Sequence, residues 1–243
     1  MGSSGRYSRR TGSGRNGRRG RKTNIAWEKA RAFFLENRLA AAGLLLLLIL
    51  TAALVIRAFV TGGSHRVNVD ASQPDIDVQL LDINPYSRPG IESNGITGIV
   101  IHYTANPGST AQDNRDYFNG LQYSQATSAS SNFVVGLDGE IIQCVPTWEV
   151  AYASNDRNYD TVSIEVCHPD ESGEFTEETY RSLVQLTAWL CVKFNLTEAD
   201  VIRHYDVTGK NCPKYFVENE DEWEAFKENV EYAISRTPQE EGE

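Results

Sequence analysis

The chain has 243 residues and a formal net charge of −10, but this charge is divided unevenly along it. Residues 1–63 contain 12 Lys/Arg and 2 Asp/Glu, a charge of +10, whereas residues 64–243 contain 11 and 31, a charge of −20. Such a division is not expected of a chain that lies wholly in one environment. The sequence contains no internal repeat. We therefore expect two parts that occupy different surroundings.

The first 22 residues are rich in Gly, Ser and Arg and show no apolar periodicity. Such a segment cannot bury enough surface to offset its conformational entropy, so we expect residues 1–38 to form a largely disordered basic tail. A basic tail is also typical of a nucleic-acid-binding arm. The segment that follows explains the charge in another way, and we expect no nucleic-acid partner.

Residues 39–60 read LAAAGLLLLLILTAALVIRAFV and are apolar except for Thr51 and Arg57. A helix of this length spans the roughly 30 Å hydrocarbon core of a membrane. The run is too long for a signal-peptide core and no clear cleavage site follows it, so we predict a retained signal anchor. Because Lys and Arg are concentrated before the run, the tail is predicted to be cytoplasmic. The remainder would then lie outside the cell membrane.

Residues 61–79 are expected to form an extended polar linker, residues 80–236 one folded domain, and residues 237–243 an acidic tail. Within the domain, β-branched runs predict strands and amphipathic runs predict helices. The Leu137-Asp138-Gly139 turn indicates a hairpin, and Thr176 is a candidate helix N-cap. We predict an α/β fold with a central mixed β-sheet flanked by helices, built from strands 97–104, 161–167 and 201–205, a hairpin 133–145, and helices 113–122, 176–194 and 219–236.

Two good zinc donors, His204 and Cys212, flank a turn-prone loop that also contains Lys210. They meet at one tetrahedral ion if the chain folds back, which Gly209 and Pro213 favour. His102 is the best third ligand because it stands in a buried strand. Three protein ligands with an open fourth position are typical of catalytic zinc. A single histidine on a strand is, however, often an ordinary core or surface residue, so spacing alone leaves both readings open.

Four motifs resemble the type 2 N-acetylmuramoyl-L-alanine amidase family, which shares its fold with peptidoglycan recognition proteins. They are GIVIHYT (98–104), SNFVVGLDGEIIQCVP (131–146), VSIEV (162–166) and RHYDVTGKNCP (203–213). The resemblance implies a Zn²⁺ cofactor held by His102, His204 and Cys212. It also implies peptidoglycan as the partner, with zinc-activated water cleaving the amide between N-acetylmuramic acid and the L-alanine of the stem peptide. The domain outside the membrane would then face the cell wall.

Glu165 is the one acidic residue in an otherwise apolar strand, where an unpaired carboxylate is costly. It is either a functional group or the buried partner of an arginine such as Arg203. The resemblance implies that Glu165 is the general base and acid. It also implies that Lys210 stabilises the tetrahedral intermediate, where loss of such a donor costs about 2–4 kcal/mol.

The chain departs from the family pattern at two places. Ser131 stands where phage amidases carry a catalytic tyrosine, and we expect it to contact the substrate and to share in proton transfer. Tyr152 replaces a Trp-His-Ala-Gly stretch and is expected to contact the substrate, with Tyr103, Asn106 and Asn158 as weaker candidates for lining the groove.

A recognition module that holds peptidoglycan without cutting it is the alternative function. Such modules typically lack a zinc ligand, often the cysteine, whereas this chain has all three. Cys167-His168 makes a poor nucleophile and base pair, because adjacent strand residues point to opposite faces. Cys144 and Cys167 either form a disulfide or pack as buried thiols, and Cys191 is expected in the core.

Overall fold

The computed structural model describes residues 27–29, 31–33, 42–43, 45–52 and 66–237. The chain divides into two compact units, Met1–Gly63 and Ser64–Glu243. In the first unit residues 45–52 are helical, and among the described residues no helix has both the length and the apolarity to cross a membrane. Much of the predicted tail and of the predicted anchor over 39–60 lies outside the described residues, as do residues 238–243.

The second unit is built on one six-stranded sheet with the order β1-β4-β3-β5-β2-β6. Its pairs are parallel except for the β3–β4 hairpin, so the predicted mixed sheet and hairpin are confirmed. The strands are β1 (Asp77–Val78), β2 (Gly98–Tyr103), β3 (Phe133–Val135), β4 (Ile141–Gln143), β5 (Thr161–Val166) and β6 (Val201–Arg203).

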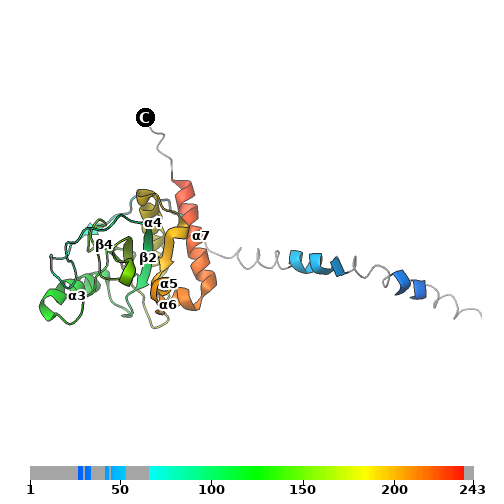
Figure 1. Ribbon diagram of the computed structural model, residues 1–243, viewed down its shortest axis with the longest axis horizontal. Helices are drawn as coiled ribbons and strands as arrows, with labels where there is room; N and C mark the ends of the chain where they lie inside the picture. The colour runs from blue at the N-terminus through cyan, green and yellow to red at the C-terminus, as the bar shows by residue number, and fades with distance from the viewer. Residues whose placement is uncertain (1–26, 30, 34–41, 44, 53–65, 238–243) are drawn as a thin grey trace, which may run out of the picture. The chain divides into compact units, whose positions relative to one another are not determined.

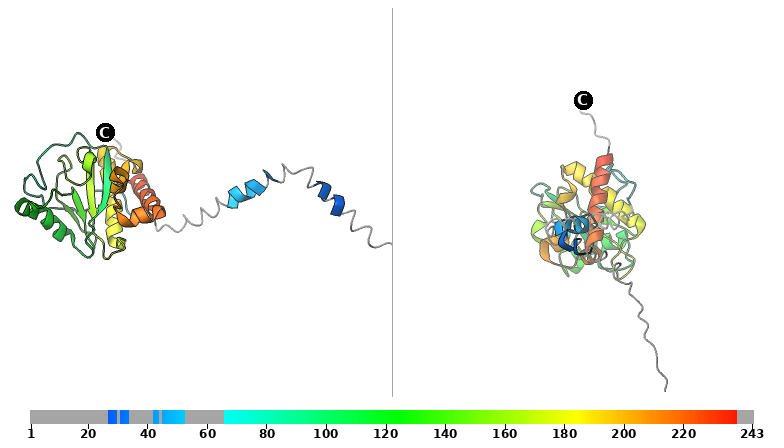
Figure 2. Two further views of the ribbon diagram at one scale, coloured as in Figure 1. Left: turned by 60° about the horizontal axis from the view of Figure 1, so that its bottom comes forward. Right: turned by 90° about the vertical axis from the view of Figure 1, so that its right-hand side faces the viewer.

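Helices cover both faces of this sheet, as Figures 1 and 2 show, with α3 on one side and α4 and α7 on the other. Thr176 caps α4 by accepting a hydrogen bond from the backbone N–H of Thr179, as the sequence predicts. The predicted helix 219–236 is preceded by a separate short helix, α6. The helices are α3 (Ala111–Ser124), α4 (Glu177–Phe194), α5 (His204–Thr208), α6 (Lys214–Glu218) and α7 (Glu220–Arg236), with 3₁₀ turns η1 (Asn155–Arg157) and η2 (Glu198–Asp200).

Strand alternation sends successive side chains of the sheet into two separate cores. Ile101 of β2 and Ile164 of β5 pack in the cluster that includes the apolar residues of α4 and α7. Val134 of β3 packs instead in the cluster that includes Ala111 and Phe118 of α3. His102 and Glu165, which are register partners of adjacent strands, therefore point to the α3 side of the sheet.

Residues 66–79, expected as a polar linker, pack against the domain. Val69 and Ala71 are buried in the core cluster shared with α4 and α7. The backbone N–H of Val67 donates to Asn229 Oδ1 at 3.0 Å, and β1 pairs with β4. The folded unit thus begins before residue 80, because alternate apolar residues of this segment find partners that are distant in sequence.

Candidate metal centre

His102, His204 and Cys212 meet in the second unit, each offering one ligand atom within 4.8 Å of the others. All three residues are buried. Ile101 of β2 pairs with Arg203 of β6, so His102 and His204, the residues that directly follow them, lie side by side. The two imidazole ring centroids are 4.6 Å apart. The predicted strand 201–205 ends at Arg203, since the chain turns into α5 at His204.

The loop after α5 brings Cys212 back to the two histidines. Gly209 ends α5 in the left-handed conformation with φ 76°, which glycine adopts without strain. The backbone N–H of Tyr205 then donates to the Cys212 carbonyl at 2.8 Å and closes the loop. Cys212 Sγ lies 3.9 Å from His102 Nδ1. The predicted folding back of the chain is confirmed.

The electrostatics of these groups determine their protonation before any metal binds. Burial, and then the charges of His204 and Lys210, hold the pKa of His102 well below its usual value. Burial followed by Lys210 also lowers the pKa of His204, so both imidazoles are neutral at pH 7. Burial raises the pKa of the Cys212 thiol to about 12, with Glu165 adding to the effect. Metal binding would therefore displace a proton from Cys212.

These residues fit a zinc ion. Two neutral imidazoles and one thiol are a donor set that zinc prefers in tetrahedral sites. His204 Nδ1 is buried without a hydrogen-bond partner in the described part of the chain, although buried polar atoms are rarely left unpaired. A ligand bond at this nitrogen would satisfy it.

Glu165 lies at the edge of the cluster, with Oε1 4.0 Å from His102 Nδ1 and its side chain 17% exposed. Burial raises the pKa of this carboxyl group to about 8, partly offset by the positive charge of Lys210. Its Oε2 has no hydrogen-bond partner among the described residues. Arg203 is not its partner, because the guanidinium binds Asp206 and Glu220 instead. The pairing of Glu165 with Arg203 is therefore excluded.

Lys210 is exposed on the loop between His204 and Cys212. Its positive charge contributes to lowering the pKa values of His102, His204 and Glu165. A cation at this position is suited to stabilising negative charge that develops beside the metal site.

The remaining predicted residues occupy different environments. Tyr103 is half-buried and stacks on the His168 ring at 5.1 Å, Asn106 is exposed, and Tyr152 is half-buried. Ser131 is fully buried, and its hydroxyl donates to the carbonyl oxygens of Phe133 and Ser163. The expected role of Ser131 stays a prediction, and its hydroxyl is bound to the backbone of β3 and β5.

Asn158 directs its side-chain oxygen into its own loop, where it accepts hydrogen bonds from the backbone N–H groups of Ala153 and Ser154. The neighbouring residues Ser154 and Asn155 are functional candidates that the sequence analysis missed. They contact His102 Nε2 and His204 Nε2 respectively. The available signal was a run of small polar residues just before a buried strand, which does not identify the histidine that each contacts.

Cys167 and His168 form no catalytic pair. Cys167 Sγ accepts from Asn114 Nδ2 at 3.5 Å, while His168 Nδ1 contacts the Asp170 carbonyl at 2.7 Å. Cys144, Cys167 and Cys191 are buried free thiols, so Cys144 and Cys167 are not joined in a disulfide.

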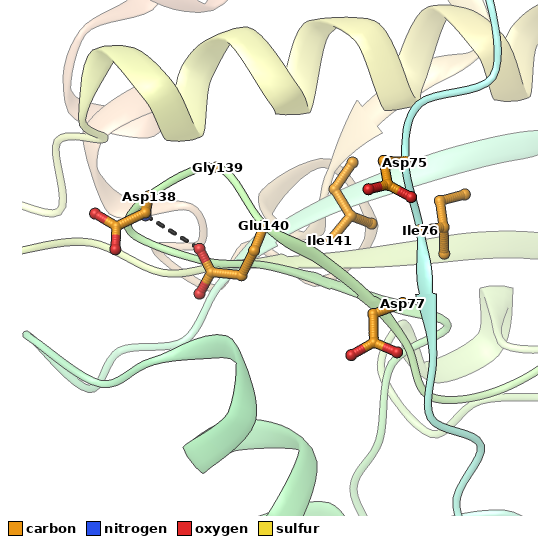
Figure 3. Close-up of a pocket in the computed structure, with 7 residues that line it drawn as sticks. All are labelled: Asp75, Ile76, Asp77, Asp138, Gly139, Glu140 and Ile141. Carbon is orange, nitrogen blue, oxygen red and sulfur yellow. Dashed lines mark hydrogen bonds between the residues drawn. The ribbon is translucent and has the colours of Figure 1, made fainter.

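A separate pocket, drawn in Figure 3, lies where β1 meets the β3–β4 hairpin. Its lining contains none of the predicted site residues, so it is distinct from the His-His-Cys cluster. The lining residues are Asp75, Ile76, Asp77, Asp138, Gly139, Glu140 and Ile141.

A mixed sheet that presents two histidines, a cysteine and an adjacent carboxylate defines a candidate metallohydrolase domain. The sequence profile Amidase_2, described as N-acetylmuramoyl-L-alanine amidase, matches residues 92–215, just over half of the chain. The protein therefore belongs to the N-acetylmuramoyl-L-alanine amidase family.

Curated relatives agree with this assignment. A "Probable N-acetylmuramoyl-L-alanine amidase" of Bacillus licheniformis is 35% identical over 65% of this chain and 47% of its own length. The "N-acetylmuramoyl-L-alanine amidase BlyA" of Bacillus subtilis (strain 168) is 33% identical over 64% of this chain and 46% of its own. The chain thus spans about half the length of the curated relatives it matches.

Two solved structures share the fold. The catalytic domain of XlyA has a TM-score of 0.55 and 24% identity, and covers 65% of this chain and 99% of its own. PlyL has a TM-score of 0.57 and 23% identity, and covers 66% of this chain and 99% of its own. At these identities the comparison establishes the α/β fold.

Proposed function

We propose that this protein is a zinc-dependent peptidoglycan hydrolase that cleaves the amide between N-acetylmuramic acid and the L-alanine of the stem peptide. The observation that carries the proposal is the buried His102, His204 and Cys212 cluster with Glu165 at its edge. Family membership supplies the substrate class. The matched relatives that are named as amidases support the same reaction.

In this mechanism His102, His204 and Cys212 hold the metal. A zinc ion bound by three protein ligands lowers the pKa of water and polarises a carbonyl oxygen. Glu165 accepts the proton of the attacking water on a carboxylate oxygen. It then gives that proton to the amide nitrogen as the carbon–nitrogen bond breaks, so that the peptide leaves as an amine. Lys210 stabilises the negative charge on the tetrahedral intermediate.

The raised pKa of Glu165 suits this double role. A carboxyl group with a pKa of about 8 holds a proton more readily than an ordinary glutamate near neutral pH. A nearby dication favours the ionised form, so zinc would move the carboxyl group towards the state that accepts a proton. Once Glu165 has taken up this proton, its neutral carboxyl group can donate it to the nitrogen of the leaving amine.

We further propose that the domain works on the outer side of the cell membrane, held there by residues 39–60. The length and apolarity of this run and the +10 charge of residues 1–63 support the proposal. Protease added to intact spheroplasts should degrade residues 64–243 and leave the basic tail protected. Degradation of the tail alone would reverse the orientation.

The activity is tested by incubating the purified protein with peptidoglycan and analysing the soluble products by mass spectrometry. We expect free stem peptides with an L-alanine amino terminus, lost after chelation and restored by zinc. Binding of zinc-loaded protein to peptidoglycan without release of peptides would contradict hydrolysis and favour a recognition module.

A further inference from the structure

Adjacent residues of one loop contact the Nε2 atoms of both histidines of the cluster. Ser154 Oγ lies 3.1 Å from His102 Nε2, and Asn155 Oδ1 lies 2.9 Å from His204 Nε2. This loop joins β4 to β5 and includes η1. The cluster therefore has its two imidazoles on β2 and α5, and the polar partners of both on a single third segment.

The contact with Asn155 determines which nitrogen of His204 carries the proton. A carboxamide oxygen only accepts hydrogen bonds, so Nε2 must donate and a neutral ring then has its lone pair on Nδ1. That Nδ1 is the buried atom without a partner in the described part of the chain. The Asn155 contact thus keeps the metal-binding lone pair available inside the cluster.

His102 is arranged in the same sense. Its Nδ1 faces Cys212 Sγ and Glu165, while its Nε2 faces Ser154. The Ser154 hydroxyl can accept from Nε2–H or donate to Nε2, so this contact fixes the orientation of the ring, with Nδ1 facing the shared centre. Ser154 is 1% exposed, so this contact is shielded from competing water.

The loop is itself braced in this conformation. The side-chain oxygen of Asn158 accepts from the N–H groups of Ala153 and Ser154. The Arg157 N–H donates to the Ser154 carbonyl at 3.0 Å, which closes the turn. Asn155 has a left-handed backbone with φ 53°, a conformation that asparagine tolerates better than most residues.

We propose that Ser154 and Asn155 are positioning residues that together set the metal affinity of the site. Asn155 fixes His204 as the Nε2–H tautomer, and Ser154 holds the His102 ring with Nδ1 facing the cluster. Groups that hold the far nitrogen of a metal-binding histidine typically contribute about 10–100-fold to affinity. The inference rests on the zinc site of the proposed function, but it concerns binding and holds whatever the substrate is.

The test measures zinc affinity by competition with a chromogenic chelator, using the full-length chain in detergent. Asn155→Gly keeps the left-handed backbone accessible and removes the acceptor, so we expect zinc binding about 10–100-fold weaker. Asn155→Asp keeps an acceptor oxygen and should bind within a few-fold of the unsubstituted protein. Ser154→Ala should weaken binding in the same direction as Asn155→Gly.

Asn195→Gly is the matched control. Asn195 also has a left-handed backbone, with φ 55°, but it is exposed and ends α4. It should leave zinc affinity unchanged. Long-range ¹H–¹⁵N spectra of the metal-free protein should show the His204 proton on Nε2, and on a mixture of both nitrogens in Asn155→Gly, a change that loss of stability alone does not produce.

Unchanged zinc affinity and an unchanged His204 tautomer in Asn155→Gly would overturn the positioning role while leaving the zinc site intact. Failure of the unsubstituted protein to bind zinc at all would overturn the zinc site itself and this inference with it. Tight zinc binding without peptide release would instead contradict only the proposed hydrolysis.

Discussion

The two faces of the sheet differ in the polarity of their buried side chains. Under α4 and α7, side chains such as Ile101, Ile164 and Leu186 fill an apolar core. On the opposite face His102 and Glu165, from the same two strands, bring polar groups to a common centre. Buried polar atoms without partners are costly, and Glu165 Oε2 and His204 Nδ1 are two such atoms in the described residues. The face under α4 and α7 is purely apolar in these positions, whereas the α3 side combines its own apolar cluster with polar groups whose burial a bound metal and substrate would offset.

Glu165→Gln should produce the largest change in activity. The amide side chain keeps the volume but neither accepts nor returns a proton, so hydrolysis should fall by about 10²–10⁴-fold. Zinc content should remain at that of the unsubstituted protein. Glu231→Gln, on an exposed part of α7, provides the control. Normal turnover by Glu165→Gln would remove this residue from the mechanism.

Leu186→Ala should affect the other face. Leu186 is fully buried in the core with α7, so the substitution should lower the free energy of unfolding by about 2–5 kcal/mol. Urea titration measures this loss. Zinc affinity at a temperature where the variant stays folded should be unchanged, and a large loss of affinity would show that the two faces are coupled.

Lys210→Ala should slow peptide release by an amount equivalent to about 2–4 kcal/mol of activation free energy. The effect should appear in kcat, because the charge is needed as the intermediate forms. Lys193→Ala removes an exposed lysine from α4 and should leave kcat unaltered. An effect of Lys210→Ala confined to KM would assign Lys210 to substrate binding.

The pH dependence of stability gives a smaller test on the metal-free protein. Folding raises the pKa of Glu165 from its ordinary 4.5 to about 8, so the folded state holds a proton that the unfolded chain releases. The free energy of unfolding of the metal-free protein must therefore decrease as pH rises from about 4.5 to 8. Glu165→Gln should be more stable than the unsubstituted protein by about 4–5 kcal/mol at pH 9, with little difference at pH 4. Equal stability at both pH values would mean that the carboxylate is not desolvated.

Much of the fold was predictable because its signals are local. The Leu137-Asp138-Gly139 turn specified the hairpin, and Thr176 with the apolar stripe behind it specified α4. The strand β1 was missed because it has two residues and exists only through its pairing with β4. The end of β6 at Arg203 was also missed, since the following helix is only five residues long.

The parts of the candidate site that could be predicted are those whose chemistry follows from the type of residue alone. His102, His204 and Cys212 are zinc donors in any context, and a carboxylate inside an apolar strand is conspicuous. Ser154 and Asn155 reach their histidines across 52 and 49 residues of chain, and nothing in the sequence encodes such a pairing. The contacts of Ser131 were not predictable, because residue type alone does not show that its hydroxyl bonds to the carbonyl oxygens of Phe133 and Ser163.

The most direct test of the zinc site is X-ray absorption spectroscopy at the zinc edge of the zinc-loaded protein, with Cys212→Ser measured alongside. We predict one sulfur at about 2.3 Å and two imidazole nitrogens at about 2.0–2.1 Å in the unsubstituted protein, with the sulfur absent from Cys212→Ser. A zinc environment without sulfur in the unsubstituted protein, or one unchanged by the substitution, would show that His102, His204 and Cys212 do not together hold the metal.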